Sequence, residues 1–393
     1  MKEGKMLLGT YYGGVEIHRE EKILYARFLT PHRVISTCMA AGGLRDDLAY
    51  LYNHQSSEPA GDHHHTHGLA ARDPFAYREV ICQRHGLPCE RCATLGTAAN
   101  MRYAVTKEAR YRDLVVVAVC TGGVEGNAGR VGDPASVYEH DGVYERISGN
   151  KPVLHGTINT MLFINRELIP GAMVRTIVTA TEAKTAVLQE LNINSRYSNR
   201  LATGTGTDQI GTASRLDTGM PLRSAGKHSA LGELIGVAVH DAIKETLALQ
   251  NSLNPEGQRS VVRHLERFGA VRIDMMEAVA ARLDDGKRAL LTANFTGLER
   301  DSLVVAAVAA LVHLRDKMSW GIIPKSSAPE LWASYGAQIA AAVSGNCRLL
   351  PGYSDVLAEE HYGIEDKDFL SLVEHALALG FQDKWPEETE KGE

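Results

Sequence analysis

Several features are scarce in this sequence, and each scarcity excludes a class of protein. Its 393 residues include six cysteines, too few for a disulfide framework in a chain of this length, so a reducing compartment is the simpler interpretation. No apolar run reaches the roughly 18–20 residues of a membrane-spanning helix, and the first residues lack the apolar core of a signal peptide. Basic residues do not outnumber acidic ones, and the net charge of −6 argues against a nucleic-acid partner. We therefore expect a cytoplasmic protein with neither a membrane nor a nucleic acid as partner.

The composition is otherwise that of a globular protein. Hydrophobic residues make up 44% and charged residues 23% of the chain, which excludes wholesale disorder. Glycine is abundant, with 37 residues. Extra glycine indicates tight turns or close backbone approaches, as expected around a binding site.

Residues 1–253 alternate between strand-like and helix-like segments. Short segments rich in β-formers predict strands, the first two as a hairpin around Gly13-Gly14. These segments are Met6–Tyr12, Val15–Arg19, Lys22–Leu29, Val34–Cys38, Leu114–Cys120 and Ile158–Asn165. Two helices are predicted, Gly171–Leu191 and Ser229–Leu249. The fold class is therefore α+β, with a mixed α/β sandwich-like domain.

Residues 254–393 have a different character and predict an all-helical C-terminal domain. Helical periodicity is found in Glu256–Leu283, Ser302–Lys317, Leu331–Val343 and Phe369–Leu379. The boundary is predicted at Leu253–Gly257, where Asn, Pro and Gly end the preceding helix. This domain of unknown role could wall a pocket, form a homo-oligomer, or be a bystander, and the last interpretation is slightly favoured.

The helix Gly171–Leu191 carries a lysine in its apolar stripe. On a helical wheel Lys184 falls among Met173, Val187 and Leu188, which should face the core. A buried ammonium group needs a partner, because an unpaired buried charge is costly. Lys184 is therefore a candidate site residue, unless its stem merely reaches water. Glu182 lies on the opposite face and is expected to be solvated.

In the segment Thr203-Gly204-Thr205-Gly206-Thr207-Asp208, threonines alternate with glycines before a carboxylate. Glycine lets the backbone approach a ligand and exposes N–H groups to an oxyanion. The spacing is neither a P-loop nor a dinucleotide fingerprint. The alternation predicts three threonines on one face of a strand, either in a site or on a polar edge strand.

His228 begins the helix that contains Gly232, Glu233 and Gly236. It shares a wheel sector with Ile235 and is predicted to aim inward, where an imidazole could move a proton. The alternative is a helix cap with a satisfied histidine.

Three further segments present polar groups. The glycine-rich loop Gly122–Arg130 carries Glu125 and Asn127, and Asn53 is expected to follow a short helix. His155–Asn165 leads through Thr157 and Asn159 into a strand. Active-site groups are often presented at such positions.

Two features resemble metal sites. The histidine-rich segment His63–His67 is expected to form an exposed loop. Adventitious metal binding, or simple solvation of the loop, is favoured over a dedicated metal site. Cys89 and Cys92 form a CxxC pair near Cys82 and His85, but no second pair follows. The sequence therefore assigns no metal ligand.

Together, several of these segments resemble the adenosylcobinamide amidohydrolases, the CbiZ family of corrinoid salvage. The resemblance lies in their order and wording over roughly residues 10–250: Leu95–Met101, Gly123–Ala128, Gly156–Thr160, Ala180–Thr185, Ala202–Asp208 and His228–Gly236. The helical extension, the histidine-rich loop and the CxxC pair lie outside it.

The resemblance implies a hydrolase that cleaves the amide between the aminopropanol arm and a corrin-ring propionate, releasing cobyric acid. The corrinoid would be the substrate, and no cofactor is required. Amide hydrolysis needs an activated nucleophile, oxyanion donors and a proton for the amine. From their chemistry we assign catalysis to Lys184, Thr205, Thr207, Asp208, His228 and Glu233. We assign substrate binding to Asn53, Glu125, Asn127, Thr157, Asn159, Thr203, Gly204 and Gly206.

Two alternatives stay open at this point. A corrinoid-binding or trafficking protein could keep the pocket without catalysis, and a metal-dependent amidase could use His63–His67. The nucleophile is either water, which we favour, or a threonine freed by chain cleavage, for example before Thr157 or Thr160.

Overall fold

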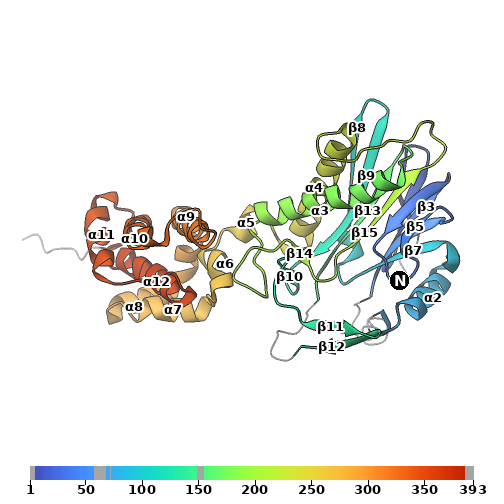
Figure 1. The fold of residues 1–393 in the computed structure, drawn as a ribbon. Coiled ribbons are helices and arrows are strands. Elements are labelled where there is room, and N and C mark those ends of the chain that lie inside the picture. The colour runs from blue at the N-terminus through green and yellow to red at the C-terminus, as the bar shows by residue number, and fades with distance from the viewer. Residues whose placement is uncertain (1–4, 57–67, 71, 148–154, 386–393) are drawn as a thin grey trace, which may run out of the picture. The chain divides into compact units, whose positions relative to one another are not determined.

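The computed structural model describes residues 5–56, 68–70, 72–147 and 155–385. It divides into two compact units, Met1–Leu253 and Asn254–Glu393 (Figure 1). The first unit holds every described strand. None of the helices among the described residues is long and apolar enough to cross a membrane.

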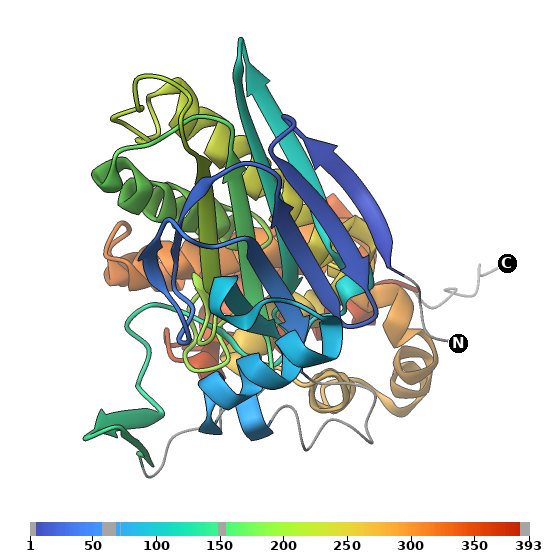
Figure 2. The same cartoon turned by 90° about the vertical axis from the view of Figure 1, so that its right-hand side faces the viewer.

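Two β-sheets form the centre of the first unit (Figure 2). The first sheet has the order β1-β2-β3-β6-β7, with strands Met6–Tyr11, Val15–Glu20, Ile23–Phe28, Tyr50–Gln55 and Cys92–Thr97. The second sheet has the order β5-β4-β15-β13-β9-β8. Its strands are Gly43–Arg45, His32–Ser36, Gln209–Arg215, Thr157–Ile164, Leu114–Gly123 and Val105–Tyr111. Two small ribbons pair β10 (Ala128–Gly129) with β14 (Gly204–Thr205), and β11 (Val137–His140) with β12 (Val143–Arg146).

The sheets pack face to face and helices cover their outer faces. Alternate residues of β9 explain this layering: Val115, Val117 and Val119 join the core between the sheets, whereas Val116 and Ala118 join the core beneath the helices. Successive side chains of a strand point to opposite faces, so a strand buried on both sides reads as a continuous apolar run. The unit is thus an α+β sandwich, and the predicted fold class is confirmed.

Three helices make the outer layers. α2 (Pro74–His85) packs on the first sheet through Tyr77 and Ile81. α3 (Pro170–Glu190) and α4 (Ala230–Asn251) pack on the second sheet. The proline at the start of α3 and the Ser229 cap of α4, which accepts from the Gly232 N–H, fix where these helices begin.

The strand directions place several strand ends together at one end of the second sheet. β13 runs parallel to β15 and antiparallel to β9. The first residues of β13 and β15 therefore lie beside the last residues of β9. The crossover through α3 makes this possible, because parallel neighbours need a long connection.

The second unit contains helices around its own core. Their bounds are α5 Pro255–Gln258, α6 Val261–Leu265, α7 Arg272–Ala280, α8 Asp285–Glu299, α9 Ser302–Ser319, α10 Ala328–Ser344, α11 Leu350–Glu359 and α12 Asp366–Gln382. Trp332, Phe369 and Phe381 are its largest fully buried side chains. The predicted all-helical character is confirmed.

Several predicted elements need correction. The helix expected over Glu256–Leu283 is three helices, since Ser260 caps a new start at α6 and Gly269 at φ +98° interrupts the chain before α7. The strand expected at Val34–Cys38 lies at His32–Ser36, and Asn53 lies in β6 rather than after a short helix. Helices α2, α8 and α11 were not predicted.

Candidate active site

An ion pair lies beside the edge where β13 and β15 begin. Lys184 Nζ of α3 is 2.5 Å from Asp208 Oδ2, and the two side chains are 15% and 13% exposed. The partner that the apolar stripe of α3 requires is therefore Asp208. Because both groups keep some exposure, a ligand can reach them.

Asp208 also holds the turn that precedes it. Its Oδ1 accepts hydrogen bonds from Thr205 Oγ1 at 2.6 Å and from the Ile158 N–H at 2.8 Å. Its Oδ2 accepts a further bond from the Thr205 N–H at 2.9 Å. All four donors, Lys184 included, suit an ionised carboxylate, which can only accept. The carboxylate thus ties the turn to β13 and to α3.

Gly204 is required by this geometry. A Cβ at this position would lie 2.5 Å from Asp208 Oδ2 and 2.8 Å from Lys184 Nζ. The segment is not the strand that its alternation predicted, since β14 comprises Gly204–Thr205 alone and Asp208 folds back onto Thr205. Local hydroxyl–backbone and carboxylate–backbone bonds compete with a strand ladder, which explains the difference.

A threonine hydroxyl and a side-chain amide both donate to the Gly156 carbonyl group. Thr207 Oγ1 donates to Gly156 O at 2.9 Å, and Asn127 Nδ2 donates to the same oxygen at 3.1 Å. Thr207 has a single hydroxyl proton, so the 2.6 Å contact between Thr157 Oγ1 and Thr207 Oγ1 places the donor on Thr157. Tyr197 Oη orients Asn127 by donating to its Oδ1 at 2.6 Å.

A buried amide network joins the two sheets at the same edge. Asn159 Nδ2 donates to Asn53 Oδ1 and to Gly96 O, both at 2.9 Å. Asn53 Nδ2 donates to Thr121 Oγ1 at 2.8 Å, and Gln209 Oε1 accepts from the Gly96 N–H at 2.7 Å. The side-chain amides of Asn53 and Asn159 are engaged within the protein, so they hold the strand ends together.

The sequence did not single out Thr121, Gln209 or Tyr197 as site residues. Thr121 was visible as a polar residue near the end of an apolar strand, whereas Gln209 begins the largely polar segment of β15. Tyr197 lies in a loop without regular structure, and no pattern pointed to it.

Other predicted residues take no part in the hydrogen bonds described above. His228 is exposed and precedes the Ser229 cap, so the wheel that predicted its inward direction does not apply to it. Glu233 is exposed in the first turn of α4 and lines a groove of about 520 Å³ with Glu182 and Lys227. Neither Lys184 nor Asp208 lines that groove. Glu125 is exposed, and Thr203 Oγ1 accepts from the Val131 N–H at 2.9 Å.

The remaining predicted residue, Gly206, packs beside Asn127: a Cβ there would meet that side chain at 3.6 Å, an ordinary contact. The Cys120 thiol lies behind the site, 3.6 Å from Thr160 Oγ1. Burial raises the pKa of Cys120 to about 12, which keeps this thiol protonated and excludes it as a nucleophile.

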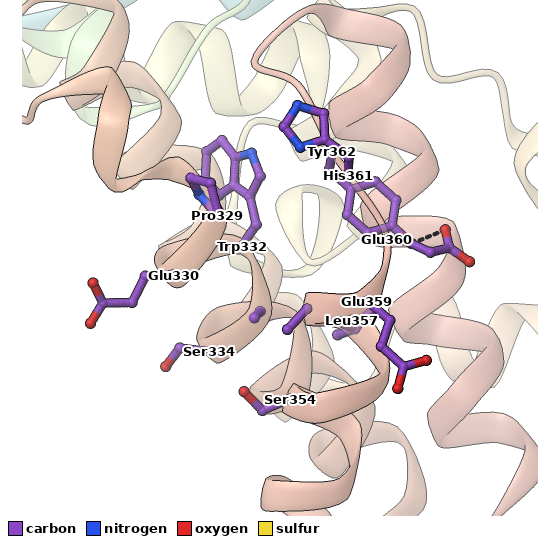
Figure 3. Close-up of a pocket in the computed structure, with 12 residues that line it drawn as sticks. Pro329, Glu330, Trp332, Ser334, Ser354, Leu357, Glu359, Glu360, His361 and Tyr362 are labelled. Atoms are coloured by element: carbon purple, nitrogen blue, oxygen red, sulfur yellow. Dashed lines mark hydrogen bonds between the residues drawn. The ribbon is translucent and has the colours of Figure 1, made fainter.

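In the part of the chain that the structure describes, no group of three or more His, Cys, Asp or Glu residues is arranged so that it could hold a metal ion. His63–His67 lie outside the described residues. The helical unit has a cavity of about 530 Å³ lined by Trp332, Leu357 and Tyr362 among others (Figure 3). In it Tyr362 Oη donates to Glu360 Oε2 at 2.7 Å, and none of the predicted site residues lines it.

Comparison with known proteins follows the same division of the chain. Residues 8–255 match the model of the family described as CbiZ, adenosylcobinamide amidohydrolase. An uncharacterized protein of Methanocaldococcus jannaschii is 36% identical over 240 residues, which cover 60% of this chain and 89% of that protein.

Two solved structures are more distantly similar. A Pyrococcus horikoshii protein has a TM-score of 0.30 at 11% identity, covering 63% of this chain and 82% of its own. An aminopeptidase/D-Ala-esterase/amidase of Ochrobactrum anthropi, described as a variant of the Ntn-hydrolase fold, has a TM-score of 0.26 at 10% identity, with the same coverages.

Proposed function

Because the chain belongs to the adenosylcobinamide amidohydrolase family, we propose that it hydrolyses the amide between the aminopropanol arm and a corrin-ring propionate of adenosylcobinamide. The products are cobyric acid and the free amine. We place the reaction at the Lys184–Asp208 ion pair. This proposal is supported by the partial exposure of the pair and by the threonine hydroxyls at the start of β13.

Lys184 is the residue we expect to act on the substrate. Its ammonium group has three N–H donors, and Asp208 accepts one of them. The others can stabilise the oxyanion that develops as the amide carbonyl is attacked. As the amine leaves, the same group can supply its proton, in place of the exposed His228 and Glu233.

Asp208 is a positioning residue in this scheme. Both of its oxygens already accept two hydrogen bonds each, which leaves it poorly suited to take a proton from water. Its carboxylate holds the Lys184 ammonium group in place through the 2.5 Å ion pair.

Water remains the nucleophile we favour, and Thr157 is the candidate for the alternative. The Gly156 carbonyl accepts from Thr207 and Asn127, and Thr157 Oγ1 is hydrogen-bonded to Thr207. Such donors polarise a carbonyl for attack. Attack of Thr157 Oγ on the Gly156 carbonyl carbon would break the Gly156–Thr157 C–N bond and give an ester. Water would then hydrolyse that ester to a Gly156 carboxylate and a Thr157 with a free amine and hydroxyl.

The function is tested by incubating the purified full chain with adenosylcobinamide and separating the products by chromatography. Cobyric acid supports the proposal, with Lys184→Met and Asp208→Asn folded but slower by roughly a hundredfold and tenfold, respectively. Binding without turnover would instead support a corrinoid-binding protein. Turnover abolished by a chelator would support a metal-dependent amidase.

The nucleophile is tested by the intact mass of the same preparation. One uncut chain supports water. Two pieces, 1–156 and 157–393, whose masses sum to the full chain plus one water, support Thr157. A Thr157→Ala variant should then remain uncut.

A further inference from the structure

Three thiols lie together beneath α2, on the outer face of the first sheet. Cys82 of α2 and Cys92, the first residue of β7, are fully buried, whereas Cys89 in the short turn before β7 is partly exposed. The three side chains belong to one cluster beneath α2, in which Cys89 packs against Cys82 and Cys92 and Cys82 Sγ lies 3.8 Å from Tyr52 Oη. This group of cysteines has no part in the proposed hydrolysis.

A buried arginine side chain lies near the thiols. Arg78 lies one helical turn before Cys82 and is 7% exposed. One of its terminal N–H groups donates to the Cys89 carbonyl, while its Nε has no hydrogen-bond partner among the described residues. A guanidinium group so placed favours a thiolate over a thiol.

The charge rests mainly on Cys82. The hydrogen bond with Cys92 is the main cause that lowers the pKa of Cys82 to about 6. Burial, followed by the Cys82 charge, raises the pKa of Cys89 to about 11. The hydrogen bond with Cys82 raises the pKa of Cys92, which therefore stays a thiol. Near neutral pH the group therefore carries one thiolate among three sulfurs.

We propose that Cys82 and Cys89 are a redox-active pair that closes into a disulfide by exchange with small-molecule disulfides. Cys89 is the entry point, because it alone of the three is accessible. Cys82 completes the exchange, because it is in contact with Cys89 and carries the thiolate.

The exchange balances in two steps. The Cys89 thiol loses its proton to solvent, and its sulfur attacks the outside disulfide, which releases one small thiolate and leaves a mixed disulfide on Cys89. The Cys82 thiolate then attacks the Cys89 sulfur, which releases the second small thiolate, and both released thiolates take up protons from solvent. Two protein thiols are oxidised and one small disulfide is reduced to two thiols.

The test is oxidation of the fully reduced full chain with oxidised glutathione, followed by intact mass measurement and peptide mapping. We expect a product lighter by two hydrogen atoms that contains a Cys82–Cys89 disulfide, and a reductant should reverse it. A disulfide between Cys89 and Cys92, or a Cys82 that stays reduced, would overturn the proposal. This mapping uses the unaltered protein and does not depend on any variant folding.

Two variants sharpen the result. Cys82→Ser should stop the reaction at a glutathione adduct on Cys89. Cys347→Ser removes an exposed thiol that lies far along the chain in another unit, and should leave closure of the disulfide unchanged. Closure that persists in Cys82→Ser would contradict the assignment.

Discussion

At the scale of single residues, the candidate site depends on how closely a glycine lets two charged groups approach. Asp208 meets Lys184 across Gly204, and a Cβ there would lie within 3 Å of both side chains. Contacts this short force the neighbours to move, so the ion pair and the side chain that should stabilise the oxyanion would be displaced together.

We therefore expect Gly204→Ala to lower turnover of adenosylcobinamide by roughly tenfold or more, a change of at least ~1.4 kcal/mol in the activation barrier. Gly171→Ala is the control, because a Cβ there meets nothing within 4 Å. Equal rates for both variants in the same assay would show that the pair tolerates the added methyl group.

A second residue-scale prediction concerns His32, which is fully buried. Its Nδ1 is 2.7 Å from the Thr30 carbonyl oxygen and must carry the proton, so Nε2 accepts from Tyr12 Oη at 3.1 Å. Burial lowers the pKa of His32 to about 4. Between about pH 6.5 and pH 4 the unfolded chain binds a proton here that the folded chain does not.

The free energy of unfolding should therefore fall as the pH drops through this range, by up to ~3 kcal/mol for this histidine. In His32→Gln this part of the dependence should be missing, while the exposed His228→Gln should behave as wild type. Denaturant unfolding at several pH values measures the difference. Parallel curves for wild type and His32→Gln would contradict the prediction.

Sequence reasoning reached some of these residues and not others. The helical wheel predicted that Lys184 needs a partner, since a charge in an apolar stripe conflicts with its surroundings. It could not name Asp208, because that contact is set by a turn rather than by a periodic element. It misplaced His228 because a wheel describes only residues inside the helix.

At the scale of elements, long and strongly periodic segments were predicted well. α3, α4, α9 and the paired strands β9 and β13 agree with their predicted bounds within a few residues. Of the omitted helices, α2 has little apolar character, and it begins at the Asp73 cap, which a search for apolar periodicity does not detect. The helices α8 and α11 were missed although their apolar residues are as clearly gathered on one face as those of α4.

α4 offers a prediction in which two glycines of one helix differ. A Cβ on Gly232 would lie 2.0 Å from the Gly226 carbonyl oxygen, whereas a Cβ on Gly236 meets nothing within 4 Å. Gly232→Ala should lower the free energy of unfolding by more than ~2 kcal/mol, since the backbone must shift. Gly236→Ala should raise it by ~0.5–1 kcal/mol through helix propensity. Chemical denaturation of both variants tests the contrast, which equal changes would refute.

At the scale of the whole molecule, each unit has a core of its own. The largest apolar cluster of Asn254–Glu393 contains no residue of the first unit, and the two main clusters of Met1–Leu253 contain none of the second. Near Asn254-Pro255 the sequence changes from mixed strand and helix patterns to helical periodicity alone, which indicates a separate helical unit. The role of the helical unit did not follow from its pattern, because helical periodicity describes packing and not ligands.

We expect a chain of residues 1–253 to fold by itself and to keep the turnover of the full chain within roughly threefold, since all residues proposed to act lie in it. Scanning calorimetry should show its unfolding transition as one component of the full-length trace. A soluble but inactive product would mean that turnover requires the helical unit, and an insoluble product would mean that residues 1–253 do not fold by themselves.

The connection between β9 and β13 has a consequence for how such a protein can diversify. Antiparallel neighbours can be joined by a two-residue turn, yet here the chain travels from Val124 to Gly156 and carries the exposed β11–β12 ribbon on the way. The two ends of this connection meet near Asn127, whose side-chain amide donates to the Gly156 carbonyl oxygen. Because the Asn127–Gly156 contact closes this connection at its base, its length or composition can vary while the strand ends keep their positions.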